Sequence, residues 1–129
     1  MASSQTVPTL DRGILSEDSQ EDRLEIIEML KKAYWMEIET VMNYITNSIN
    51  PDGLRAQEVI EALQGDIQEE LTHAQAFARR IKELWGVVPG SLEFEAEQTA
   101  LQPPETQTDI VHVIKGVIAA ERIMEEFGD

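Results

Sequence analysis

The sequence has no cysteine, only two histidines and few basic side chains. Without cysteine, the chain forms no disulfide, thiolate metal site, iron–sulfur cluster or cysteine nucleophile. Its 10 Lys and Arg against 25 Asp and Glu give a formal net charge of −15. So few basic side chains cannot neutralise a row of phosphates. We therefore expect no nucleic-acid partner and no binding to an anionic membrane surface. The same charge favours cationic partners, metal ions included.

Long apolar runs are also lacking. No stretch approaches the roughly 20 apolar residues of a transmembrane helix. The N-terminus has no basic region followed by an apolar core, as a secretory signal would. We therefore expect a cytoplasmic protein. An apolar fraction of 42% in 129 residues is typical of one globular domain.

What is present is helical periodicity in three segments. Apolar residues three and four apart predict an all-α fold, with helices at about 21–50, 54–85 and 108–127. We expect 1–20 to form an N-terminal arm and 21–129 the helical domain. The apolar stripes place in the core, among others, Leu24, Ile45, Ile114 and Ile118.

The segment between the second and third helices is rich in proline and glycine. Residues 86–107 contain no long periodic stretch, and such a loop is unusual inside a compact domain. It is natural in a bundle whose second and third helices are parallel and joined by a crossover. Ser19 is a plausible N-cap of the first helix, and Gly86 is predicted as the C′ glycine that ends the second.

Three glutamates fall inside the apolar stripes, one in each predicted helix. They are Glu37, Glu70 and Glu121. Buried carboxylates without partners are strongly disfavoured and repel one another, and a bound cation resolves both problems. His73 follows Glu70 by three residues, so both side chains lie on one helix surface. This spacing lets one helix offer an oxygen and a nitrogen to one metal.

Other acidic and histidine residues have simpler interpretations. A single inward glutamate often lies at the edge of a stripe and reaches water, so the prediction depends on the joint pattern. Asp109 and His112 repeat the acid-x-x-His spacing, but at the opening of a helix, where we expect a surface histidine. Glu39 and Glu69 are predicted to lie on a solvated face.

These motifs resemble the ferritin-like superfamily, and the bacterioferritin branch most closely. The first is Glu37-x6-Tyr44 within EIETVMNY, and the second is EELTHA, which contains Glu70 and His73. The third is Glu121 within VIAAERIMEEF. The end of the crossover and the following helix, PPETQTDIVHVIKGVIAAER, are also similar to this family.

The resemblance implies a ferritin-like helical bundle with a non-haem di-iron site. Glu37 would be a terminal ligand of one iron, Glu70 a bridge, His73 the nitrogen ligand and Glu121 a terminal ligand of the second iron. Tyr44 would donate a hydrogen bond behind these ligands. Carboxylates with imidazole suit iron, and manganese is possible. The implied function is ferroxidase activity with iron storage or detoxification, in which a homo-oligomer oxidises Fe(II) with O₂ or peroxide.

Two departures from the family pattern matter. Haem-binding members have a methionine after the glutamate of the second motif; Leu71 stands here, so we expect no haem. The fourth helix with a second Glu-x-x-His is missing. The site would be completed by the rest of a longer chain or, as in encapsulated ferritins, by a partner chain; otherwise it has lost activity. The alternative functions are a helical scaffold or assembly protein with a relic site and a rubrerythrin-like peroxide reductase.

Overall fold

The three predicted helices are present, and all regular secondary structure in the described residues is helical. The computed structural model describes residues 13–53, 56–106 and 109–128. The elements are η3 (Glu17–Ser19), α1 (Gln20–Ile49), α2 (Ala56–Glu83), η4 (Ser91–Glu93) and α3 (Ile110–Gly128). The all-α prediction is confirmed. The helix bounds agree within a few residues, except that 54–55 and 108 lie outside the described residues.

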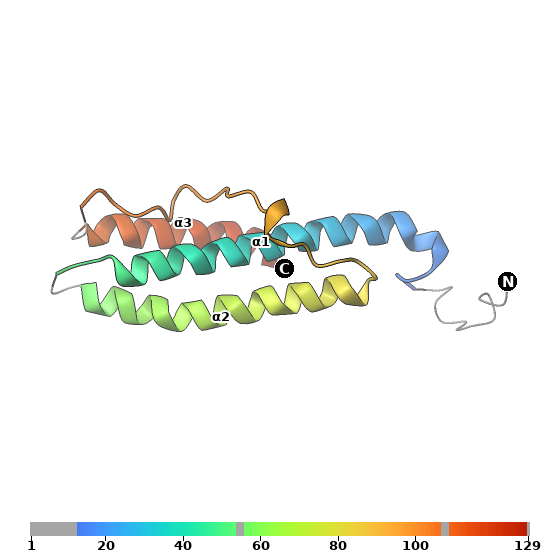
Figure 1. Ribbon diagram of the computed structural model, residues 1–129, viewed down its shortest axis with the longest axis horizontal. Helices are drawn as coiled ribbons and strands as arrows, with labels where there is room; N and C mark the ends of the chain where they lie inside the picture. Colours follow the sequence, from blue (N-terminus) through green and yellow to red (C-terminus); the bar gives the residue numbers. More distant parts are fainter. Residues whose placement is uncertain (1–12, 54–55, 107–108, 129) are drawn as a thin grey trace.

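The three long helices lie alongside one another, and α1 and α2 form a hairpin (Figure 1). These two helices are antiparallel, as their short connection requires. Helix α3 lies beside α1 and runs in the direction of α2, while the crossover returns along the length of the molecule. The predicted parallel arrangement of the second and third helices is therefore correct.

Apolar side chains pack into two separate clusters. One contains Tyr44, Leu63 and Leu101 with two residues of α3. The other contains Ile27, Ile81 and Leu84 and is extended by Ile14 and Leu15 of the N-terminal arm. Along the helices, buried Glu37 of α1 and buried Glu70 of α2 lie between the two clusters.

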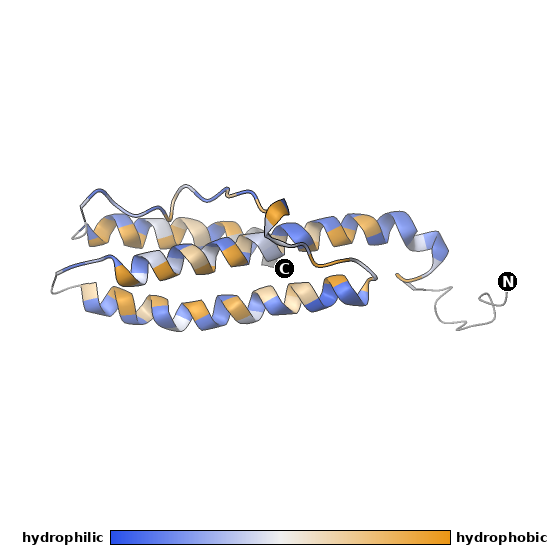
Figure 2. Cartoon of the chain, in the orientation of Figure 1, coloured by the Kyte–Doolittle hydropathy of each residue, from blue (hydrophilic) through white to orange (hydrophobic). Residues whose placement is uncertain are grey.

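Some stripe residues expected in the core are exposed. Ile114 and Ile118 of α3 are 43% and 48% exposed, and Leu24 and Ile45 of α1 are also exposed. Helix α3 instead buries Val113 and Ala120, because these residues face α1 and the crossover. Apolar residues recur along all three helices (Figure 2), and on α1 and α3 they occupy exposed as well as buried positions.

The end of α2 differs in detail from the prediction. The left-handed residue is Trp85, with φ of 69°, and not Gly86. The amide of Gly86 donates to the carbonyl of Ile81 and that of Trp85 to Lys82, which is the Schellman pattern. A Cβ on Gly86 would lie 2.8 Å from Cγ2 of Ile81, so glycine is needed there for packing.

The crossover is held on α1 by buried polar side chains. Glu39 was predicted on a solvated face, but it is buried because its carboxylate accepts the amides of Glu97 and Gln98. Asn47, also buried, donates to the carbonyl of Leu101 over 2.8 Å. On the opposite side, the carbonyl oxygen of Ala100 lies against α3 at Gly116.

The start of α1 is also held by backbone contacts. Ser19 occupies the predicted N-cap position but makes no side-chain cap hydrogen bond. The guanidinium of Arg23 instead donates to the carbonyls of Ile14 and Ser16 and lies 5.1 Å from the ring centroid of Trp85. None of the helices in the described part of the chain has the length and apolarity to cross a membrane.

Candidate metal centre

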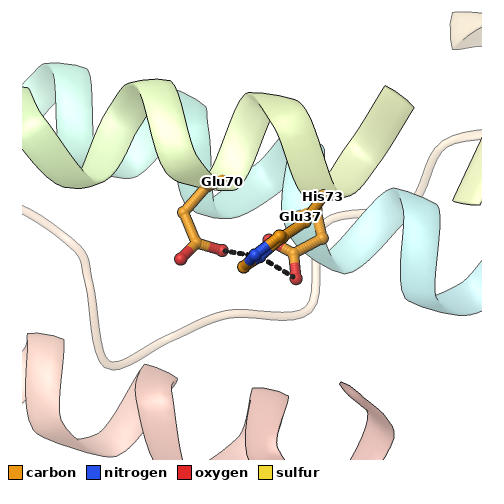
Figure 3. Close-up of side chains that lie close together, drawn as sticks. All are labelled: Glu37, Glu70 and His73. Atoms are coloured by element: carbon orange, nitrogen blue, oxygen red, sulfur yellow. Dashed lines mark ion pairs between the residues drawn. The ribbon is translucent and has the colours of Figure 1, made fainter. Parts of the chain in front are cut away.

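Glu37, Glu70 and His73 meet between the two apolar clusters. Nδ1 of His73 lies 3.7 Å from Oε1 of Glu37 and 3.7 Å from Oε2 of Glu70. One ligand atom from each residue lies within 4.8 Å of the other two. Figure 3 shows the imidazole between the two carboxylates, with Glu70 and His73 on α2 and Glu37 on α1. The three-residue spacing on α2 and the antiparallel hairpin together create this group.

The two carboxylates are withdrawn from water. Glu37 is 6% exposed and Glu70 is 5% exposed, whereas the side chain of His73 is 48% exposed. Oε2 of Glu37 and Oε2 of Glu70 are buried and accept no hydrogen bond. Buried oxygens without donors are costly, unless a cation or a proton satisfies them.

The electrostatics of the cluster favour a bound positive charge. Burial, the adjacent Glu70 carboxylate and smaller contributions from Glu121 and Glu69 together raise the pKa of Glu37 from 4.5 to about 9. Without a cation, Glu37 therefore retains its proton near neutral pH. A divalent cation bound here would replace this proton.

The spacing of these atoms suits one metal ion after a small contraction. Two ligand atoms about 2.1 Å from a cation lie about 3.0–3.6 Å apart at angles of roughly 90–120°. The two separations from His73 Nδ1, 3.7 Å each, are slightly wider, and the oxygens of Glu37 and Glu70 lie within 4.8 Å of each other. Two oxygens and one imidazole nitrogen form a donor set suited to Fe, Mn or Zn.

Glu121, the fourth predicted ligand, is not part of the three-residue group. It is half-buried on α3, and its carboxylate Oε1 accepts a hydrogen bond from the hydroxyl of Tyr44. Burial raises the pKa of Glu121, and Glu70 adds to the shift, while the Tyr44 hydrogen bond opposes it. The same environment raises the pKa of Tyr44, chiefly by burial and then by Glu121, so its hydroxyl stays protonated.

Asp66 is an acidic neighbour of the site that the sequence reasoning missed. It is half-buried on α2, and burial raises its pKa, with Glu69 and Glu70 adding to the shift. It also acts electrostatically on Glu121. The available signal was its position four residues before Glu70, on the same side of the helix.

The second acid-x-x-His pair has a structural role, as predicted. The side chain of Asp109 accepts the backbone amide of His112 and so caps the start of α3. His112 is exposed, and its Nε2 lies 3.0 Å from the carbonyl oxygen of Gln102. Glu69, predicted on a solvated face, is exposed.

A separate cavity of about 650 Å³ lies between α1, the crossover and α3. Its lining includes Lys32, Trp35, Gln98 and Ile123 but none of the four predicted metal ligands. Trp35 also packs against Phe94, with 5.0 Å between ring centroids. In the described part of the chain, two of the three buried side-chain oxygens without donors belong to Glu37 and Glu70, and the third is Oδ1 of Asn47. Only the first two lie beside a histidine nitrogen, so we identify the candidate centre there.

Comparison with protein-family models, curated proteins and solved structures yields no match.

Proposed function

We propose that this chain binds Fe(II) at Glu37, Glu70 and His73, with Glu121 at a second iron position, and promotes its oxidation to Fe(III). The observation that supports this most directly is the pair of buried carboxylates whose Oε2 atoms have no donor. An imidazole nitrogen lies beside both of them. Mn(II) has similar ligand preferences and is the alternative metal.

The proposed reaction moves two electrons from two iron ions to one oxidant. Two Fe(II) become two Fe(III), and O₂ takes up the two electrons with two protons to give H₂O₂. With peroxide as the oxidant, two electrons and two protons convert H₂O₂ to two water molecules. Carboxylates favour Fe(III) over Fe(II) because the higher charge is held more strongly by anionic oxygens.

The side chains around the proposed site assist cation entry. Glu69 is exposed and Asp66 half-buried on the same helix as Glu70. The net charge of −15 raises the local concentration of cations such as Fe(II). His73 is partly open to solvent, which provides access for a small oxidant.

One imidazole and three carboxylates are few ligands for two iron ions. We therefore propose that further donors complete the site, supplied either by a longer chain or by a second copy of this chain. The exposed Ile114 and Ile118 are apolar surface of the kind that such packing covers. We propose a homo-oligomer, with iron storage or detoxification as its role.

The test is anaerobic Fe(II) binding followed by oxidation in air, measured on the wild type and two double variants. Glu70→Ala/His73→Ala removes the site, and Asp109→Asn/His112→Ala alters the matched acid-x-x-His pair while keeping the cap on α3. We expect about two Fe(II) per completed site and oxidation faster than buffer in the wild type and the control.

The Glu70→Ala/His73→Ala variant should lose both properties. If it binds and oxidises iron like the wild type, the proposal is wrong. A wild type that binds no metal but associates with another protein through its apolar faces favours a scaffold with a relic site. Rapid reduction of peroxide by an added electron donor favours a rubrerythrin-like peroxide reductase.

A further inference from the structure

The cavity between α1, the crossover and α3 is large enough to hold a small organic molecule. Its volume of about 650 Å³ lies within the range of about 300–1,000 Å³ that is typical of ligand sites. The lining includes the buried Glu39 as well as the exposed Glu95, so the cavity extends from the surface into the interior. None of the described residues that line it belongs to the Glu37–Glu70–His73 group.

The larger apolar side chains of the cavity lie outside the core. Trp35 and Met36 of α1 are half-buried, and Ile123 of α3 is 43% exposed. Neither of the two apolar clusters in the described part of the chain contains any of these three residues. The indole of Trp35 is held between Tyr34 and Phe94, with 5.3 and 5.0 Å between ring centroids. An ordered ring beside unpacked apolar side chains is a surface that the apolar part of a ligand can cover.

The charges around the cavity favour a cation. Five glutamates line it, against Lys31 and Lys32. One of the glutamates, Glu39, accepts two backbone amides, and a second pairs with Lys31 over 3.2 Å. The three that form no ion pair with any described residue are Glu93, Glu95 and Glu97. Their charge exceeds that of Lys32, and both an acidic cleft and an indole ring attract cations.

A bare metal ion suits this cavity less well than an organic cation. In the described part of the chain, the acidic and histidine side chains that lie close enough to share a metal are Glu37, Glu70 and His73. The glutamates of the cavity therefore do not converge as a set of metal ligands. An organic cation uses the apolar side chains as well as the charge.

We propose that the cavity binds a small organic cation in which an ammonium group is joined to an apolar body. The apolar body covers Trp35, Met36 and Ile123. The ammonium group lies near the indole of Trp35 and the carboxylates of Glu93 and Glu95. Because the cavity is separate from the metal centre, the cation should bind equally well with and without metal.

The test is isothermal titration calorimetry of the wild type with three probes that share a phenyl ring and differ in charge. They are 2-phenylethylamine, which is positive at neutral pH, the neutral 2-phenylethanol and the negative 3-phenylpropanoate. We expect the amine to bind with a dissociation constant of about 10 mM or lower. The alcohol should bind at least about tenfold more weakly, because it lacks the cation–π contact and the attraction to the carboxylates. The anion should bind most weakly.

Two double variants with the same change in net charge locate the ammonium group. Glu93→Gln/Glu95→Gln removes two exposed carboxylates at the cavity, and Glu58→Gln/Glu61→Gln removes two exposed carboxylates of α2 away from it. We expect the first variant to bind the amine about fivefold more weakly, since one nearby charge has about this effect in water. The second should bind it like the wild type.

The two tryptophans locate the apolar body of the probe. Trp35 lines the cavity and Trp85 does not. In Trp85→Phe the remaining Trp35 should change its fluorescence when the amine is added. In Trp35→Phe the remaining Trp85 should not respond.

Three results would overturn this proposal. The first is an amine that binds the wild type no better than the alcohol, or does not bind at about 10 mM, and this result requires no variant to fold. The second is equal weakening by the two pairs of glutamine substitutions, which would reduce the effect to overall charge. The third is a fluorescence response of Trp85 in place of Trp35, which would put the probe at another site.

Discussion

Oε2 of Glu39 lies 2.7 Å from the amide nitrogen of Gln98, 59 residues later in the chain. The neighbouring amide of Glu97 donates to both oxygens of the same carboxylate, at 2.9 and 3.1 Å. A buried acid of α1 thereby satisfies two backbone donors of a segment without regular secondary structure.

Replacement of Glu39 by alanine should lower the free energy of unfolding by about 1–3 kcal/mol, because two backbone amides lose their acceptor. Urea denaturation followed by circular dichroism measures this change. Glu28→Ala is the control, since Glu28 is exposed and pairs with Lys31 over 3.2 Å. The free energy of unfolding of Glu28→Ala should fall by less than about 0.5 kcal/mol. Similar losses for both variants would contradict the role assigned to Glu39.

Gly116→Ala should destabilise the protein although alanine is the better helix former. A Cβ at this position would lie 2.2 Å from the carbonyl oxygen of Ala100, so the crossover must move away from α3. We expect a loss of about 1–3 kcal/mol. In Gly65→Ala nothing lies within 4 Å of the new Cβ, and this variant should gain up to about 1 kcal/mol. Thermal or urea unfolding should give opposite signs for the two variants.

The metal-free protein should lose stability as the pH rises. Glu37 ionises near 4.5 ordinarily and at about 9 in the folded protein, so the folded state binds the extra proton between these values. The stabilisation is complete below pH 4.5 and falls through pH 9, with a slope of at most about 1.4 kcal/mol per pH unit for one proton. Urea unfolding with a chelator at pH 6, 7 and 8 measures this slope.

The control for the pH dependence is Glu37→Gln, which removes the titrating carboxyl and keeps its size. Its unfolding free energy should change less between pH 6 and 8 than that of the wild type. The pKa values of Asp66 and Glu121 are also raised by burial, so any contribution from these groups has the same sign. An unchanged or steeper slope in the variant would show that Glu37 is not the main group.

Bound Mn(II) should make the wild type more stable than a variant that lacks the charge of Glu70. Without metal, Glu70→Gln should be as stable as the wild type or more stable, because the amide at this buried position carries no charge. Mn(II) at about 100 times its dissociation constant should stabilise the wild type by about 2.7 kcal/mol and the variant much less. Melting temperatures with and without Mn(II) test this. Equal metal-induced shifts in both proteins would remove Glu70 from the site.

The helices and the core of the site were predictable because they depend on local spacing. Periodicity indicated three helices, and their order with a long connection indicated a parallel crossover. The inward positions of Glu37 and Glu70 followed from the stripes, and the place of His73 followed from a three-residue separation on one helix. Each of these inferences uses the geometry of one helix or of one hairpin.

The remaining features depend on contacts between distant segments. The burial of Glu39 requires the crossover to lie on α1, which periodicity does not encode. The hydrogen bond between Tyr44 and Glu121 requires a particular register of α1 against α3. The left-handed residue is Trp85 and not Gly86, and Gly86 is instead required because a Cβ there would meet Ile81, a contact that only packing reveals.

The attachment of the crossover divides it into two parts with different tolerance to changes in length. Between Val87 and Ala96 the chain is mostly exposed, and added or deleted residues there alter a solvent-facing path. From Glu97 to Leu101, by contrast, the backbone is fixed by Glu39 and Asn47 on one side and by Gly116 on the other. One inserted residue in that stretch would misalign all three attachments together. Natural variation in the length of this connection should therefore fall outside residues 97–101.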